Sequence, residues 1–182
     1  MTDPHDRNDP KNDPKNDPQP AGTARRKLAL ERTFDASIED VWELWTTKEG
    51  VESWWGPEGF HVEVRAIDPR PGGQMRYAMI ASAPEVVAHM KRAGMPLVTE
   101  ATLTYREILP RRRLAYFHAV DFVPGVAAYD VETLVELHAG AAGVRMVVTI
   151  EAMHDAHWTE MARQGWESQL DKAVRLLAAR QR

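Results

Sequence analysis

The stretch Trp54-Trp55-Gly56-Pro57 constrains the fold more than any other part of this sequence. Two adjacent indole side chains are too large to be hidden together easily, so at least one of them should line a shared interior. Gly56 and Pro57 are typical of a helix end, and the residues that follow alternate as in a strand. The stretch therefore marks a helix-to-strand junction, which favours the wall of an internal pocket.

Two short helices are predicted before this junction. Ser37 and Asp40 have the spacing of a capping box, so a helix should begin at Ser37 and run to about Thr47. Thr46 and Glu49 repeat that spacing and predict a second short helix that ends at the junction. The apolar residues at helical intervals in these two segments are Val41, Trp42, Leu44, Trp45, Val51, Trp54 and Trp55.

Alternating apolar and polar residues predict that the remainder is rich in β-strands. One strand, residues 28–34, precedes the helices, and a hairpin with a turn at residues 71–73 follows the junction. Residues 84–93 are predicted to form a helical insertion that can cover the pocket. Further strands are predicted at residues 99–108, 113–122, 129–138 and 144–152. By parity, the inward-facing residues of the last three strands are Tyr116, His118, Val120, Thr133, Val135, Leu137, Met146, Val148 and Ile150.

A long amphipathic helix is predicted from Asp155 to about Arg180. This segment lacks proline, and its apolar residues recur at near-helical intervals. Gly165 lies in its interior, where glycine costs about 1 kcal/mol relative to alanine. We therefore expect the sheet, a ligand or another helix to approach the chain closely at Gly165.

The bulk composition fits one folded domain. The 182 residues include 43% apolar residues, which is enough for a single core. Residues 1–24 repeat an Asn-Asp-Pro-Lys pattern whose side chains cannot form a core, so we expect a disordered tail, with a partner-binding segment as the alternative. Residues 25–182 are the predicted domain.

Composition also excludes several classes of function. A net charge of -4 and a pI of about 6.0 give no broad basic field for nucleic acid or an anionic membrane. The absence of cysteine excludes disulfides and thiol nucleophiles. No stretch approaches the ~20 apolar residues of a membrane span, and the polar, acidic N-terminus does not resemble a signal peptide. No cofactor motif is present, so we expect no cofactor. The lack of cysteine fits the reducing cytoplasm, where we expect the protein.

Four local motifs accompany this order of elements. They are Trp54-Trp55-Gly56-Pro57-Glu58-Gly59-Phe60, Asp68-Pro69-Arg70-Pro71-Gly72-Gly73, Glu107-Ile108-Leu109-Pro110 with Arg113-Leu114, and Gly165-Trp166 with Leu170. Together with the element order, they resemble the SRPBCC (START-like) superfamily, and within it the branch related to the activator of the heat-shock protein 90 ATPase. The resemblance covers residues 28–180. It is interrupted at residues 84–98, where that branch usually has a short hairpin.

The resemblance implies an α+β helix-grip fold, in which a curved antiparallel sheet wraps around a long C-terminal helix. It also implies a hydrophobic cavity between sheet and helix for a small apolar or amphipathic molecule. The superfamily includes lipid carriers, polyketide cyclases, aromatases, hormone receptors and chaperone regulators, so the fold leaves the activity open.

The candidate site residues are those expected to face this cavity. The candidate ligand-binding residues are Trp55, Phe60, Tyr77, Met79, Tyr116, His118, Met161 and Trp166. Plain core packing is the alternative for each aromatic residue. His118 and Tyr116 are also the candidates for acid–base catalysis, because an imidazole or a phenol inside an apolar site can transfer or orient a proton. A hydrogen-bonded structural histidine is the alternative for His118.

One polar cluster near the start of the last helix is interpreted as a surface feature. Glu151, His154, His157 and Glu160 carry atoms that can bind a metal, but the two histidines straddle the predicted helix start. A His-Glu-x-x-His motif is also lacking. We therefore predict no metal site.

Three functions are compatible with these observations. The first is noncatalytic binding of a small hydrophobic or amphipathic molecule in the cavity. The second is a cyclase- or hydratase-like acid–base enzyme that acts there. The third is regulation of a heat-shock chaperone ATPase by protein–protein contact, which rests on the resemblance alone. The sequence does not decide between a monomer and a homodimer formed through an exposed sheet face or the insertion.

Overall fold

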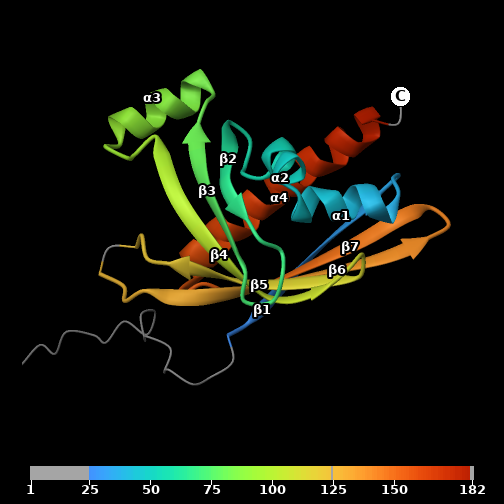
Figure 1. Cartoon of the computed structure of the whole chain (residues 1–182). Coiled ribbons are helices and arrows are strands. Elements are labelled where there is room, and N and C mark those ends of the chain that lie inside the picture. Colours follow the sequence, from blue (N-terminus) through green and yellow to red (C-terminus); the bar gives the residue numbers. More distant parts are fainter. Residues whose placement is uncertain (1–24, 124, 181–182) are drawn as a thin grey trace, which may run out of the picture.

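The chain forms one seven-stranded antiparallel sheet and four helices in the computed structural model, which describes residues 25–123 and 125–180 (Figure 1). The strands are β1 (Lys27–Phe34), β2 (Phe60–Ile67), β3 (Gln74–Ala81), β4 (Val98–Leu109), β5 (Arg113–Val120), β6 (Tyr129–Gly140) and β7 (Gly143–Glu151). The helices are α1 (Ile38–Thr46), α2 (Lys48–Trp54), α3 (Pro84–Arg92) and α4 (Ala156–Arg180). The predicted α+β helix-grip architecture is confirmed, whereas the predicted tail at residues 1–24 lies outside the described residues.

The sheet has the strand order β1-β7-β6-β5-β4-β3-β2. β1 is first in the sequence but pairs with β7, because α1 and α2 carry the chain across to the opposite edge, where β2 begins. Strands β2–β4 bend away from the rest of the sheet, and α4 lies within the curve (Figure 1). The backbone neighbours of α4 are mainly β1 and α2. This arrangement leaves the concave side of β3–β5 without close backbone cover from α4.

Burial on the concave face follows the predicted parity. All of the predicted inward-facing residues of β5–β7 are buried except His118, which is partly exposed. The register places Tyr116 opposite Thr133, and Thr133 opposite Ile150, so one buried row crosses three strands. Since side chains alternate between the two faces of a strand, this row fixes which residues face α4.

The junction between α1 and α2 corrects one prediction about helix capping. Ser37 caps α1 as predicted, because its Oγ accepts a hydrogen bond from the Asp40 backbone N–H at 3.1 Å. Thr46 does not cap α2; its hydroxyl instead donates to the Trp42 carbonyl at 2.9 Å. Thr47 is the N-cap, and its Oγ1 accepts from the Gly50 N–H at 3.0 Å. A single residue thus ends one helix and begins the next, so the second helix begins one residue later than the spacing predicted.

The predicted helical insertion is confirmed as α3. Its base is attached to the α2–β2 connection, because the Gly59 carbonyl accepts hydrogen bonds from the backbone N–H groups of Ser82 at 2.9 Å and Ala83 at 3.1 Å. The Ser82 hydroxyl donates to the same carbonyl at 3.1 Å. Within the described ranges, no helix combines the length and apolar character needed to cross a membrane.

Candidate functional site

An aromatic cluster centred on Trp55 fills the junction between the sheet, α2 and α4. Trp55 is only 6% exposed. Its ring centroid lies 5.3 Å from that of Trp54, 5.6 Å from Trp45, 5.8 Å from Trp166, 6.1 Å from Tyr77 and 6.2 Å from Tyr116. Most of these contacts are edge-to-face, the geometry that aromatic quadrupoles favour. The structure therefore brings together four of the predicted site residues, and it adds Trp45.

The two adjacent tryptophans of the Trp54-Trp55-Gly56-Pro57 motif have different environments. Trp54 is completely buried, and its indole N–H donates to the Leu44 carbonyl at 2.9 Å, which ties α2 to α1. Trp55 follows the last residue of α2 with an extended backbone, which turns its ring towards the sheet. Trp54 is thus a core residue, whereas Trp55 forms the inner wall of the space beside α4.

Four inward-facing residues next to this cluster are only partly covered by the rest of the protein. They lie on neighbouring strands, since Tyr77 pairs with Ala101 and His118 lies between Leu103 and Val131 in the register. All four are partly exposed although strand parity directs them to the concave side. We call them the concave patch: Met79, Ala101, His118 and Val131. A residue that faces inward but is accessible must border a space that protein atoms do not fill.

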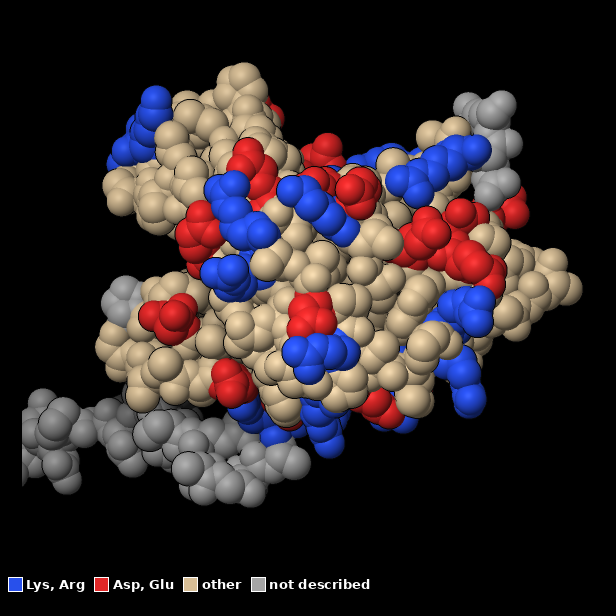
Figure 2. All heavy atoms as spheres, viewed as in Figure 1, with Lys and Arg blue, Asp and Glu red and all other residues tan. Residues whose placement is uncertain are grey.

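Helix α4 covers the sheet with only part of its length. Its buried residues are confined to its C-terminal half, namely Gln169, Leu170, Ala173 and Leu177. Viewed as in Figure 1, the molecular surface is hollowed between the part that carries α3 and the part that carries the β5–β6 connection (Figure 2). The hollow and the concave patch together indicate an open space beside the N-terminal half of α4.

The structure corrects the prediction for Gly165 and separates Met161 from the cluster. A Cβ atom added at Gly165 would meet no atom of the described residues within 4 Å, so the predicted close approach of the sheet or another helix is wrong, and the approach of a ligand stays a prediction. The physical reason is that α4 packs closely only through its C-terminal half. Met161, one turn earlier, is 51% exposed and lies on a solvent-facing side of the helix. Phe60 is partly exposed at the start of β2 and does not join the ring contacts of the cluster.

The polar groups near the concave patch are kept uncharged by burial. Burial lowers the pKa of His118, and the nearby carboxylates of Asp121 and Asp130 offset this shift only in part. The His118 ring lies 6.5 Å from that of Tyr77. Burial also raises the pKa of Tyr116 well above its usual value, and its hydroxyl has no hydrogen-bond partner among the described residues. Thr133 lies opposite and lowers the pKa of Tyr116, which offsets this shift in part, although its hydroxyl lacks the geometry of a hydrogen bond.

The lowered pKa of His118 predicts a pH dependence of stability. Between the lowered folded pKa and the unfolded value of about 6.5, the unfolded chain binds a proton at this residue that the folded chain does not. Stability should therefore decrease as pH falls below about 6.5. Urea denaturation at several pH values should show a shallower decrease for His118→Gln than for the parent protein. Identical pH profiles for the two proteins would contradict the assignment.

Two polar side chains of α4 hold the backbone of the junction. The Gln169 Oε1 atom accepts a buried hydrogen bond from the Gly56 N–H at 3.0 Å. The Lys172 ammonium donates to the Gly56 carbonyl at 3.0 Å, and burial lowers the pKa of this lysine. Sequence reasoning missed both residues. The available signal was Gln169, a polar residue directly beside Leu170 on the apolar side of the helix.

Loss of the Gln169 contact should destabilise the protein. Gln169→Leu removes the only acceptor described for the buried Gly56 N–H, and an unsatisfied buried donor costs about 1–2 kcal/mol. Chemical denaturation should show this loss in the free energy of unfolding. The matched control is Gln164→Leu on the exposed side of α4, where the amide contacts only Glu160, at 2.8 Å. Equal losses in the two variants would show that the Gly56 contact has no special importance.

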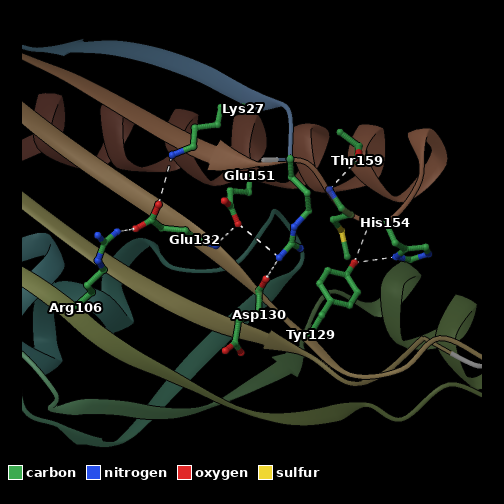
Figure 3. A network of polar contacts seen from close by, with 10 residues as sticks. Lys27, Arg106, Tyr129, Asp130, Glu132, Glu151, His154 and Thr159 are labelled. Carbon is green, nitrogen blue, oxygen red and sulfur yellow. Dashed lines mark hydrogen bonds and ion pairs between the residues drawn. The ribbon is translucent and has the colours of Figure 1, made fainter. Parts of the chain in front are cut away.

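Two of the four residues considered as metal ligands, Glu151 and His154, take part in a polar network (Figure 3), whereas Glu160 accepts hydrogen bonds from Arg163 on α4. The Tyr129 hydroxyl lies 2.8 Å from His154 Nδ1 and accepts a hydrogen bond from the His154 backbone N–H at 3.1 Å. Which of the two groups donates in the contact with Nδ1 depends on the tautomer of His154. Glu151 accepts from the Glu132 backbone N–H at 3.2 Å and pairs with Arg25 at 3.7 Å. Across residues 25–123 and 125–180, no group of three or more acidic or histidine side chains is arranged to hold a metal.

A separate surface hollow of about 210 Å³ lies between α1 and the β4–β5 turn. It is lined by Glu39, Trp42, Glu43, Pro110 and Arg111. Arg111 pairs with Glu39 at 3.3 Å across it. None of the predicted ligand-binding residues lies there, so this hollow and the concave patch are distinct.

Residues 35–178 match the family model described as activator of Hsp90 ATPase homolog 1-like protein. The chain belongs to this family. The match includes α1–α3, β2–β7 and α4 up to residue 178, and so the whole of the site described above. The branch to which the motifs pointed is thereby confirmed. No curated protein sequence matches the chain.

Several solved structures share the fold of this family member. A protein from Chromobacterium violaceum is 24% identical, with a TM-score of 0.68 over 83% of this chain and 96% of that one. The AHSA1 protein from Silicibacter pomeroyi is 19% identical, with a TM-score of 0.66 over 85% and 99% of the two chains. An AHSA1-like protein from Aeromonas hydrophila is 21% identical, with a TM-score of 0.65 over 85% and 93%. At these identities the likeness concerns the fold alone.

Proposed function

We propose that the protein binds a small hydrophobic or amphipathic molecule between the concave face of the sheet and α4. The concave patch is the observation that carries this proposal. Partly exposed apolar residues on an inward face are unfavourable unless another apolar surface covers them. The aromatic cluster beside the patch supplies an apolar wall, and His118 supplies a polar group that can orient a ligand.

The proposal is tested by filling the space. Ala101→Phe places a large ring between the concave patch and α4, whereas Thr102→Phe, the next residue on β4, places the same ring on the opposite face. N-phenyl-1-naphthylamine, a neutral fluorescent probe, should bind the parent protein and Thr102→Phe with Kd values of about 10 µM. Ala101→Phe should bind at least about tenfold more weakly.

Two results would overturn the binding function. One is equal probe affinity for Ala101→Phe and the parent, since the probe would then lie elsewhere. The other is failure of a broad panel of apolar compounds to bind the parent in native mass spectrometry. Circular dichroism of both variants checks that the fold is retained.

The family description favours a second candidate function, stimulation of a heat-shock chaperone ATPase. Contact with such a chaperone would use the surface of the protein and would not need the concave patch. An ATPase assay with the chaperone and the full chain separates the two candidates. Stimulation that Ala101→Phe leaves unchanged would support the chaperone role, and no stimulation would count against it.

A further inference from the structure

The chemical character of the space beside α4 is set by the residues that face it. The inward positions of β3–β6 around the concave patch, as far as they are described, carry no lysine, arginine, aspartate or glutamate. The nearby part of the aromatic cluster is Trp55, Tyr77 and Trp166. A ligand here would be surrounded by rings, methyl groups and thioethers, with only uncharged polar groups.

The electrostatic environment of His118 disfavours both negatively and positively charged ligands. The carboxylates closest in effect to this imidazole are those of Asp121 and Asp130, which would repel an anion. Burial keeps the imidazole neutral, so it offers no positive charge to pair with a carboxylate. The same two carboxylates would attract a cation, but both residues are exposed at the surface and neither is at an inward-facing position. A cation would therefore lose its hydration in the apolar space without a described carboxylate that faces it.

The polar groups that are present suit a neutral oxygen. A neutral imidazole offers one N–H donor and one acceptor. Two residues earlier on the same face of β5, the Tyr116 hydroxyl is buried without a partner. A ketone or hydroxyl oxygen can accept a hydrogen bond from such donors without bringing a charge into the interior.

Within the binding function proposed above, we propose that the site selects uncharged, ring-containing molecules with a ketone or hydroxyl oxygen directed at His118. Carboxylates and amines of the same shape are rejected. The walls favour a planar ring because Trp166, which is partly exposed at the edge of the aromatic cluster, offers it an aromatic surface. The charge of the ligand should affect its affinity more strongly than the hydrogen bond to His118 does.

Competition against N-phenyl-1-naphthylamine at neutral pH tests this selection with probes of one shape. The probes are 2-acetylnaphthalene, 2-naphthoate and 2-(aminomethyl)naphthalene, which are neutral, anionic and cationic. The ketone should compete about 100-fold better than either charged probe. Naphthoate should improve as pH falls towards the pKa of a carboxylic acid, about 4, because its protonated form is neutral.

Variants of His118 test the hydrogen bond. In the parent protein, 2-acetylnaphthalene should bind about tenfold more tightly than 2-ethylnaphthalene, which lacks the oxygen. His118→Leu should abolish this ratio while leaving 2-ethylnaphthalene binding intact, which also shows that the variant is folded. His118→Gln, which keeps a donor and an acceptor, should preserve part of it.

The outcomes separate this inference from the function on which it rests. Equal or tighter binding of naphthoate or the amine would overturn the neutral-ligand inference and leave ligand binding standing. An unchanged ratio in His118→Leu would overturn the role of His118. Binding of none of the probes, including N-phenyl-1-naphthylamine, would overturn both the inference and the proposed function.

Discussion

Replacing Trp54 with alanine is expected to lower the free energy of unfolding by about 3–5 kcal/mol. The indole is completely buried, packs 4.8 Å from the Trp45 ring and donates a hydrogen bond to Leu44. Its loss would leave a large cavity and an unsatisfied carbonyl between α1 and α2. Since a domain is typically stable by about 5–15 kcal/mol, the variant should lose much of its stability.

Urea denaturation followed by far-UV circular dichroism measures this loss. Trp42→Ala is the matched control, because Trp42 lies on α1 and is only partly buried. We expect the control to lose about 1 kcal/mol. Comparable losses in the two variants would contradict the assignment of Trp54 as the core residue of the helix pair.

Alanine at Gly50 is expected to destabilise the protein by about 3 kcal/mol, although alanine is the better helix former. A Cβ atom there would lie 1.9 Å from the Glu43 carbonyl oxygen, which belongs to the backbone of α1 and cannot move aside alone. The two helices would have to separate, and with them the tryptophans that line the site. Thermal and urea denaturation should both detect the change.

Gly165→Ala is the control for Gly50→Ala, and it should change stability in the opposite direction. A Cβ at Gly165 meets no atom within 4 Å, so only the backbone effect remains. We expect a gain of about 0.5–1 kcal/mol. Destabilisation by Gly165→Ala would contradict the open surroundings described for this residue of α4. No loss of stability in Gly50→Ala would contradict the close packing of α2 against α1.

The elements could be predicted from the sequence because their signals are local. Strand parity placed Tyr116, Thr133 and Ile150 on one face, and the register joins them in one row. The cap of α2 was predicted one residue too early because two threonines are adjacent and only geometry decides which one ends α1. The local sequence pattern thus predicted the helices and strands, but not the exact residues at which they begin and end.

The site was predictable only in part, because it depends on how distant segments meet. The aromatic residues Trp55, Tyr77, Tyr116 and Trp166 do come together. The close approach of the sheet or a helix expected at Gly165 was wrong, since helical spacing does not show how much of a helix the sheet covers. Gln169 was missed because its partner is a backbone N–H, which no sequence pattern identifies.

The residues of the Trp54-Trp55-Gly56-Pro57 motif and its continuation to Gly59 have different structural roles. Trp54 holds the two short helices together, and Trp55 forms a wall of the proposed site. The backbone of Gly56 is bound to α4 through Gln169, and the Gly59 carbonyl is bound to the base of α3. One short connection is therefore attached both to α4 and to the part that carries α3, which borders the hollow in Figure 2.

The indole N–H signals of the tryptophans provide the most direct test of the central claim, which is that a ligand binds between the sheet and α4. Their chemical shifts can be followed by two-dimensional NMR during titration with N-phenyl-1-naphthylamine. Our account predicts large shifts for Trp55 and Trp166 and none for Trp42, which lines the separate hollow on α1. Shifts at Trp42 with Trp55 and Trp166 unchanged would contradict it.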